Sequence, residues 1–117
     1  MKKHYILYFC LLLSYGLNAQ ISGTVFRDFN NSGIKENTAT FNEPFVSGTT
    51  VKATLANGTS FTTTTDANGT YSFSAAQIPS GTSVRIEFID PTGSSIQGTS
   101  NGTNVQFSTG GTSNVNY

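Results

Sequence analysis

Short stretches in which apolar and polar residues alternate are the feature that most limits what this chain can fold into. In the segment 83–89, Val84, Ile86 and Phe88 alternate with polar residues. A period of two residues places all three side chains on one face of a β-strand. Asn and Gly interrupt such stretches about every ten residues, as turns between strands do. Beyond residue 20 no stretch has the apolar period of about 3.6 residues that marks a helix. The pattern predicts an all-β chain.

We expect about seven strands, which at this spacing indicate an antiparallel β-sandwich. The expected strands are 21–26, 49–55, 60–65, a strand carrying Tyr71 and Phe73, 83–89, 104–108 and 113–117. The side chains expected to point inward are Ile21, Val25, Val51, Ala53, Leu55, Phe61, Tyr71, Phe73, Val84, Ile86, Phe88, Val105, Phe107, Val115 and Tyr117. The pair Asn57-Gly58 predicts a tight type I′ hairpin turn, and residues 92–102 predict a long loop.

Residues 1–19 have the composition of an export signal and are excluded from the folded domain. Two lysines precede an apolar run over residues 6–13 that is too short to span a bilayer. Ala19 then supplies the small residue that signal peptidase requires. Cys10 raises lipid attachment as an alternative, but it lies inside the apolar run and not at its end. We predict a signal peptide at 1–19, one domain at 20–117 without a transmembrane helix, and a secreted or cell-surface location.

Removal of this leader would also remove the chain's single His, Cys and Met. The remainder keeps six acidic and four basic side chains, a net charge of −2, which argues against binding to nucleic acid. Without an imidazole, a Ser or Thr nucleophile lacks its usual base. Without Cys, no disulfide stabilises a core of modest size. We therefore predict a protein that is not an enzyme.

The segment 28–44, between the first two expected strands, carries side-chain oxygens at alternating positions. Asp28, Asn30 and Ser32 alternate, and Glu36 follows after Gly33. Ca²⁺ takes about six to eight oxygen ligands at about 2.3–2.6 Å, and a short loop supplies them through this alternation. Gly33 permits a sharp turn. Ile34 is expected to offer its carbonyl oxygen while its side chain points into the protein.

The later part of this segment departs from the pattern of an EF-hand calcium loop. Ala39 stands where an EF-hand has a bidentate Glu. The next carboxylate, Glu43, comes four residues later and closes the site only if residues 37–42 bulge outward. A solvated turn is the alternative interpretation, because Asn, Ser and Gly favour turns for local backbone reasons alone.

Several segments in succession resemble the SdrD B-like repeat family of bacterial surface adhesins. They cover roughly residues 21–90 and comprise Ile21–Asp28, Asn30–Glu36, Glu43-Pro44, Thr50-Val51, Thr64–Phe73 and Pro79–Thr82. The oxygen-rich loop is fairly specific to this family, whereas the hairpin at 64–73 is shared with many transthyretin-like modules. Phe26 stands where family members often carry Trp.

The resemblance implies a Greek-key sandwich of the immunoglobulin-like or prealbumin-like type that binds Ca²⁺. By the same resemblance, the metal ligands are Asp28, Asn30, Ser32, Glu36, Glu43 and the carbonyl of Ile34. Members act as rigid spacers in longer surface proteins. The implied partners are therefore neighbouring domains and an extracellular host or matrix ligand.

The residues and the family resemblance leave two candidate functions of different classes. The first is a calcium-stabilised structural or adhesive module of a secreted or cell-surface protein, and it is the one we favour. The alternative is a transthyretin-like accessory domain, of the carboxypeptidase-regulatory type, in a larger exported enzyme or outer-membrane receptor. Such a domain is expected to lack the loop ligand set.

Three Asn-Gly-Thr triplets, which begin at Asn57, Asn68 and Asn101, match the acceptor pattern for N-linked glycans. Each also contains Asn-Gly, a strong signal for a hairpin turn. We interpret the triplets as turns.

Overall fold

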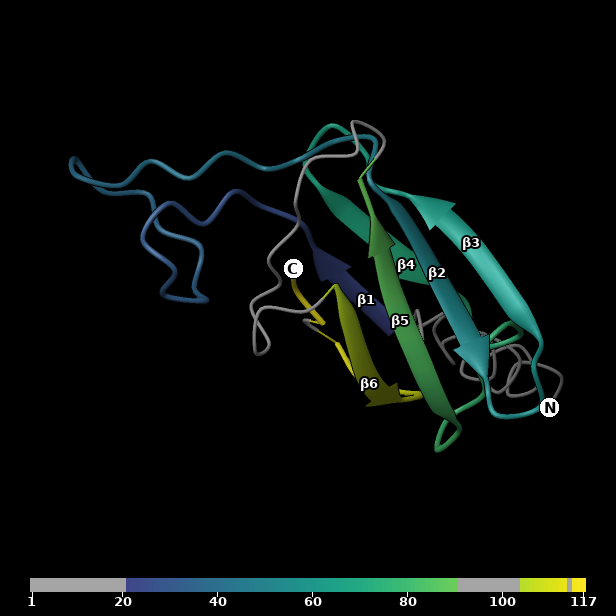
Figure 1. Ribbon diagram of the computed structural model, residues 1–117. Helices are drawn as coiled ribbons and strands as arrows, with labels where there is room; N and C mark the ends of the chain where they lie inside the picture. Colours follow the sequence, from purple (N-terminus) through teal and green to yellow (C-terminus); the bar gives the residue numbers. More distant parts are fainter. Residues whose placement is uncertain (1–20, 91–103, 114) are drawn as a thin grey trace, which may run out of the picture.

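The computed structural model describes residues 21–90, 104–113 and 115–117 (Figure 1). Its strands are β1 (Ile21–Thr24), β2 (Thr50–Leu55), β3 (Ser60–Thr64), β4 (Thr70–Phe73), β5 (Ser83–Ile89) and β6 (Val105–Thr109). Within these ranges there is no helix, and hence none that is long and apolar enough to cross a membrane. The predicted signal peptide and the predicted loop at 92–102 lie outside the described residues.

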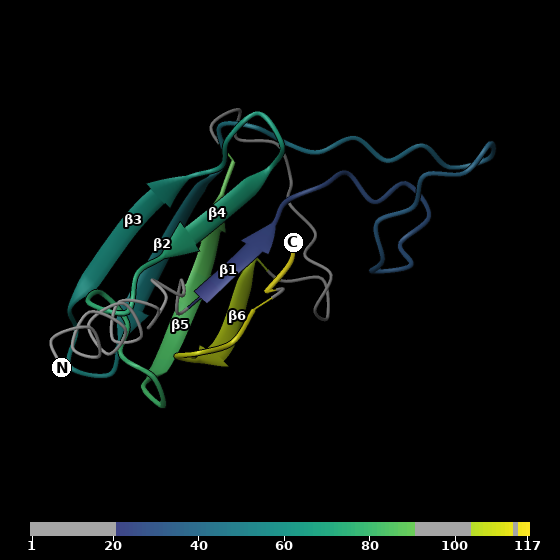
Figure 2. The ribbon, with the colours of Figure 1, turned by 180° about the vertical axis from the view of Figure 1, so that it is seen from behind.

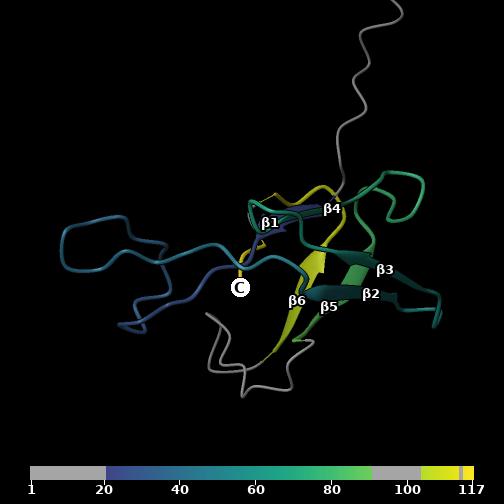
Figure 3. The ribbon, with the colours of Figure 1, turned by 90° about the horizontal axis from the view of Figure 1, so that it is seen from above.

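The strands form two antiparallel sheets that face each other. One pairs β1 with β4, and the other has the strand order β3-β2-β5-β6. Figures 2 and 3 show the small sheet lying over one face of the larger one. After the β2–β3 hairpin the chain crosses to the small sheet as β4 and then returns as β5 beside β2, which is Greek-key connectivity. The predicted all-β sandwich is confirmed.

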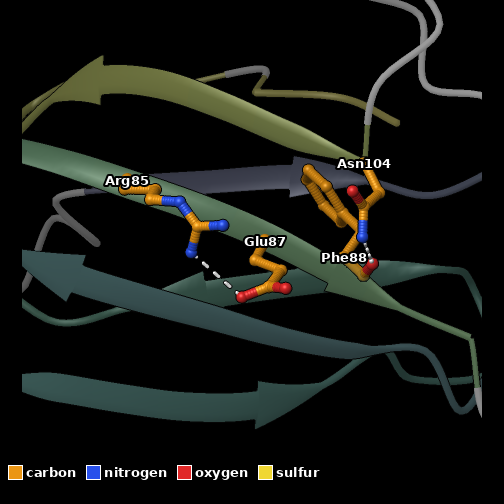
Figure 4. Close-up of polar contacts among 4 residues, drawn as sticks. All are labelled: Arg85, Glu87, Phe88 and Asn104. Atoms are coloured by element: carbon orange, nitrogen blue, oxygen red, sulfur yellow. Dashed lines mark hydrogen bonds and ion pairs between the residues drawn. The ribbon is translucent and has the colours of Figure 1, made fainter.

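Strict alternation fixes which side of β5 faces the interior. Val84, Ile86 and Phe88 are buried, while Arg85 and Glu87 point to the outer face and form an ion pair at 3.0 Å (Figure 4). Both charged side chains remain partly exposed, so this pair contributes only about 0–1 kcal/mol. Burial of the apolar face therefore determines how the strand lies in the sandwich.

Aromatic side chains join the two sheets across the interior. Tyr71 from β4 packs edge-on against Phe88 from β5, with ring centroids 5.7 Å apart. Tyr117 stacks on the same Phe88 ring at 4.4 Å. The hydroxyl of Tyr71 donates a hydrogen bond to the carbonyl of Val115. Burial raises the pKa of Tyr71, and burial together with the charge of Asp90 raises the pKa of Tyr117 to about 12, so both hydroxyls keep their protons at neutral pH.

The segment 115–117 lies beside β1 and runs in the same direction. Val115 N–H donates to the carbonyl of Ser22, and Tyr117 N–H donates to that of Thr24. The Tyr117 carbonyl in turn accepts the N–H of Phe26. These bonds are those of a short parallel pairing, although the segment is not assigned as a strand. The inward positions predicted for Val115 and Tyr117 are confirmed, since both are buried.

The inward positions predicted for Val105 and Phe107 are wrong. In the register of β6, Phe107 lies opposite Arg85 and Val105 opposite Glu87. Directly opposed residues share one face of a sheet, so both lie on the outer face. Phe107 is 82% exposed. The inward residue between them is Gln106, whose side-chain amide donates to the carbonyl of Asn116 at 2.6 Å. A polar contact, not an apolar one, joins β6 to the segment 115–117.

The turn predicted at Asn57-Gly58 is present, but it is not of type I′. Type I′ requires positive φ at both central residues, and Asn31 is the one residue other than Gly with positive φ in the described chain. Leu55 N–H donates to the carbonyl of Thr59, and Gly58 N–H donates to that of Leu55. The loop therefore has three residues and ends on a left-handed Gly58, a common hairpin form.

Two phenylalanines on adjacent strands test this assignment of faces. Phe88 is fully buried, whereas Phe107 is exposed. We expect Phe88→Ala to lower the free energy of unfolding by about 3–5 kcal/mol, the range for deletion of a core aromatic. Phe107→Ala should change it by less than about 0.5 kcal/mol. Urea denaturation of both variants measures the difference, and a large loss from Phe107→Ala would contradict the assignment.

Candidate metal centre

The oxygen-rich segment forms an arm that projects from one end of the sandwich (Figures 1 and 2). We call residues 27–44 the arm. Backbone bonds close its base, where Arg27 N–H donates to the carbonyl of Pro44 at 2.9 Å and Val46 N–H to that of Val25 at 2.9 Å. Phe26, the aromatic residue at the start of the arm, is buried. The two ends of the arm are thus fixed side by side on the sandwich.

Glu43 links the two halves of the arm. Its side chain is 1% exposed. One carboxylate oxygen accepts the N–H of Phe29 at 3.0 Å, and the other accepts the N–H of Glu36 at 2.8 Å. A second bond joins the same residues, because Glu43 N–H donates to the carbonyl of Glu36. The carboxylate therefore satisfies two backbone donors that would otherwise be left without partners.

Asp28 organises the turn at residues 30–33 in a similar way, by accepting backbone N–H groups. Its carboxylate accepts the N–H groups of Asn30, Ser32 and Gly33 at 3.2, 3.1 and 2.7 Å. Positive φ at Asn31 and Gly33, 58° and 75°, lets the backbone wrap around the carboxylate. The role predicted for Gly33 at a sharp turn is confirmed.

These contacts also set the acidity of Asp28. Burial acts to raise its pKa, but the N–H groups of Gly33 and the three preceding residues act in the opposite direction. The net result is a pKa below the ordinary value. The Asp28 carboxylate is therefore charged at neutral pH and is available to a cation.

The remaining candidate ligands lie close to Asp28. Asn30 Oδ1 accepts the N–H of Ser32 at 3.1 Å, so it lies beside the Asp28 oxygen that accepts the same N–H. The hydroxyl of Ser32 donates to the carbonyl of Ile34 at 3.1 Å. The side-chain amide of Asn30 donates to Glu36 Oε2. Five of the six predicted ligands are thus joined by contacts with one another.

The inward side chain predicted for Ile34 is wrong, since Ile34 is 69% exposed. The arm stands away from the sandwich, so no core lies beneath it. Glu43 contacts the arm through backbone N–H groups rather than through the other ligand side chains. Asp28, Glu36 and Glu43 do not gather into one cluster in the described chain.

The oxygens that the arm brings together fit a hard cation. Asp28 and Glu36 supply carboxylates, while Asn30, Ser32 and the Ile34 carbonyl supply neutral oxygens. All are of the kind that Ca²⁺ prefers, and the count comes close to the six to eight or so that it takes once water is included. Nitrogen and sulfur ligands, which Zn²⁺ and Cu²⁺ favour, are missing from the arm.

One contact in the arm was not anticipated from the sequence. The Lys35 ammonium lies over the ring of Phe45, 4.4 Å from its centroid. Such a cation–π contact is worth about 0.5–1 kcal/mol at an exposed site. It holds the positive charge of Lys35 against the base of the arm. A spacing of ten residues across a loop carries no sequence signal for such a contact.

The described chain is thus a small β-module, a two-sheet antiparallel sandwich with an oxygen-rich arm after its first strand. The family model described as the SdrD B-like domain matches residues 19–116, and the chain belongs to that family. Its domains are structural modules of bacterial cell-surface proteins. Comparisons with curated proteins and with solved structures gave no match.

Removal of the Glu43 carboxylate should loosen the arm even without metal. We expect Glu43→Ala, measured in chelator, to lower the free energy of unfolding by about 1–3 kcal/mol, the cost of leaving a buried backbone donor unpaired. Glu36→Ala, which removes a more exposed carboxylate, is the matched control and should have a smaller effect. Equal effects from the two substitutions in chemical denaturation would show that Glu43 has no special role in the arm.

The low pKa of Asp28 predicts how the arm responds to acid. A carboxyl group whose pKa is lower in the folded protein stabilises it above the unfolded pKa, about 3.9, and this stabilisation is lost as the pH falls through the folded value. The amide shift of Gly33, followed by NMR in chelator, should therefore titrate with a midpoint below about 3.9. A midpoint above that value would contradict the hydrogen bonding described for Asp28.

Proposed function

We propose that this chain is a non-catalytic structural module of a secreted or cell-surface protein, and that Ca²⁺ binding to the arm stiffens it. Membership of the SdrD B-like family supports the structural role. The charge distribution in the arm supports the ion.

The arm holds more negative charge than its own basic side chains neutralise. In the part of the chain that the structure describes, the one salt bridge is Arg85–Glu87, far from the arm in sequence. Glu43 carries its carboxylate at 1% exposure with backbone N–H groups as its hydrogen-bond donors. The arm has three carboxylates, on Asp28, Glu36 and Glu43, and two basic side chains. Asp28 and Glu36 lie among neutral oxygens that contact one another. This gathering of oxygen ligands is the observation that carries the proposal.

A bound ion would act on the side-chain contacts already present. Asp28, Asn30, Ser32, Glu36 and the Ile34 carbonyl are the groups that would hold it, and Ca²⁺ would supply the positive charge that draws their oxygens together. In the structure described, the amide of Asn30 donates to Glu36 and partly fills this role. Glu43 would fix both halves of the arm from the sandwich side, whether or not it also contributes an oxygen to the ion.

Ion binding would also fix the direction in which the arm projects from the sandwich. A bound ion would replace weak, exposed hydrogen bonds by several metal–oxygen contacts within one turn. Because the bonds Arg27–Pro44 and Val46–Val25 close the base of the arm, a stiff arm would hold a fixed direction relative to the sandwich. We propose that this gives neighbouring domains, or an extracellular ligand, a defined surface to meet.

Calcium should therefore raise the stability of the protein. One site stabilises by RT ln(1 + [L]/Kd), about 2.7 kcal/mol when the free ion is about one hundred times Kd. For a domain of this size each kcal/mol corresponds to roughly 4–8 °C in Tm. We expect Tm to rise by that order between chelator and millimolar Ca²⁺ in differential scanning calorimetry.

Two carboxylate substitutions locate the effect. Asp28→Ala should abolish the rise in Tm, whereas Glu87→Ala, which removes a carboxylate from the outer face of β5, should leave it intact. Equal melting temperatures in Ca²⁺ and in chelator, or a rise that survives Asp28→Ala, would leave the solvated-turn interpretation of the arm in place.

A further inference from the structure

Two turns of this protein, one in the β2–β3 hairpin and one between β3 and β4, have the same sequence and the same local geometry. Residues 56–59 and 67–70 both read Ala-Asn-Gly-Thr. In each, the Gly N–H donates at 3.0 Å to the carbonyl three residues earlier, and the Gly has positive φ, 87° at Gly58 and 67° at Gly69. Since sequence and turn type are matched, any difference in chemical behaviour between them arises from their surroundings.

An Asn that precedes Gly is able to react with its own main chain. The backbone nitrogen of Gly attacks Cγ of the Asn, a C–N bond closes a cyclic succinimide, and the side-chain nitrogen leaves as ammonia. Water then opens the ring at either carbonyl. The product is aspartate, or isoaspartate, in which the main chain runs through the former side chain. Water is the one co-reactant, and Gly favours the reaction because it has no side chain to obstruct ring closure.

The surroundings of Asn57 favour this reaction. Its Oδ1 accepts the N–H of Thr59 at 2.9 Å. Negative charge develops on that oxygen during attack at Cγ, and a fixed N–H donor stabilises such charge. The same bond folds the side chain toward the residues that follow it. Gly58 N–H is bonded to the Leu55 carbonyl, as Gly69 N–H is to that of Asp66, but nothing lies within 4 Å of where a Gly58 Cβ would be, so this turn has room to move.

The surroundings of Asn68 oppose it. The corresponding donor, Thr70 N–H, is bonded to Asp66 Oδ1 at 2.9 Å instead of to the Asn side chain. Asn68 N–H is bonded to the same carboxylate oxygen. The next residue, Gly69, is buried, and its carbonyl accepts the N–H of Val25 at 2.8 Å. The main chain is therefore held on both sides of the Asn68–Gly69 peptide, by Asp66 before it and by Val25 after it.

Packing around Gly69 adds to this restraint. A Cβ at Gly69 would lie 2.5 Å from the carbonyl oxygen of Val25 and 3.0 Å from Cβ of Phe45. The turn is thus packed against the base of the arm, and the main chain at Gly69 has no space to move into. At Gly58 the equivalent position faces open space.

We propose that Asn57-Gly58 is a self-modification site that converts to aspartate or isoaspartate, and that tertiary packing protects the identical Asn68-Gly69. Either product places a negative charge at the tip of the β2–β3 hairpin. Isoaspartate also lengthens the main chain within the turn, which sets the register of the pairing. Because β3 lies at an edge of its sheet, the change would loosen an edge strand and leave the arm intact.

Peptide mapping of the aged full chain tests the proposal. The protein is incubated at mildly alkaline pH and then digested with a protease that cleaves before Asp, which separates residue 57 from residue 68 at Asp66. Mass spectrometry detects the gain in mass when an amide becomes an acid, and isoaspartyl methyltransferase labels the isoaspartate. We expect conversion at Asn57 to be several-fold faster than at Asn68 in the folded protein and equal at the two sites in denaturant.

Asn57→Gln is the matched control, because Gln would need to close a larger ring. It should remove the conversion from its own peptide and leave the rate at Asn68 unchanged. Equal rates in the folded protein, faster conversion at Asn68, or no conversion at either site while both react in denaturant would each overturn the proposal. The third Asn-Gly pair, Asn101-Gly102, lies outside the described residues and in a separate peptide.

Discussion

The contact of Phe88 with two tyrosines is the interaction on which the rest of the structure depends. Its ring meets Tyr71 of the opposite sheet on one side and Tyr117 on another, so a single β5 side chain joins both sheets and the segment 115–117. A chain of this length without disulfides has few other means of holding two small sheets together. The position of β1 follows, since β1 lies between β4 and that segment. The arm leaves from the end of β1 and takes its direction from it.

Carboxylates give the arm its internal order. Asp28 binds three N–H groups of one turn, and Glu43 binds one N–H from each half. Charged acceptors of this kind make stronger hydrogen bonds than neutral ones. The arm has three carboxylates against two basic side chains. The residues that shape the backbone of this loop are thus also the ones proposed to bind a cation.

Much of the fold could be predicted because its signals are local. Strict alternation located β5 to the residue, and the spacing of Asp28, Asn30 and Gly33 located a turn whose contacts span only a few residues. Alternation in β6 showed that Val105 and Phe107 share a face, but it could not show which face is covered. That depends on Gln106 reaching Asn116, a contact between separate segments. The expected type I′ turn was wrong because the loop includes Ala56 and is one residue longer than Asn-Gly alone suggests.

The candidate site also has a part that the sequence predicts and a part that it does not. Its five clustered oxygen donors lie within nine residues, where order along the chain nearly fixes neighbours in space. The inward side chain predicted for Ile34 fails because the arm projects from the sandwich, which the local order of residues does not reveal. The buried position of Glu43 depends on the closure of the whole arm at its base. Nothing in the sequence around Glu43-Pro44 encodes the partners that it finds at Phe29 and Glu36.

The parallel arrangement of β1 and the segment 115–117 has a consequence for how the sandwich would respond to a pulling force. Tension applied backward at Ile21 and forward at Tyr117 would slide the two segments past each other along their length. The bonds from Val115, Tyr117 and Phe26 lie across that direction, so they would bear the load together instead of parting one after another. Shear of this kind resists extension far better than peeling does. The pairing of β1 with the segment 115–117 therefore has the geometry that keeps the sandwich folded when Ile21 and Tyr117 are pulled apart.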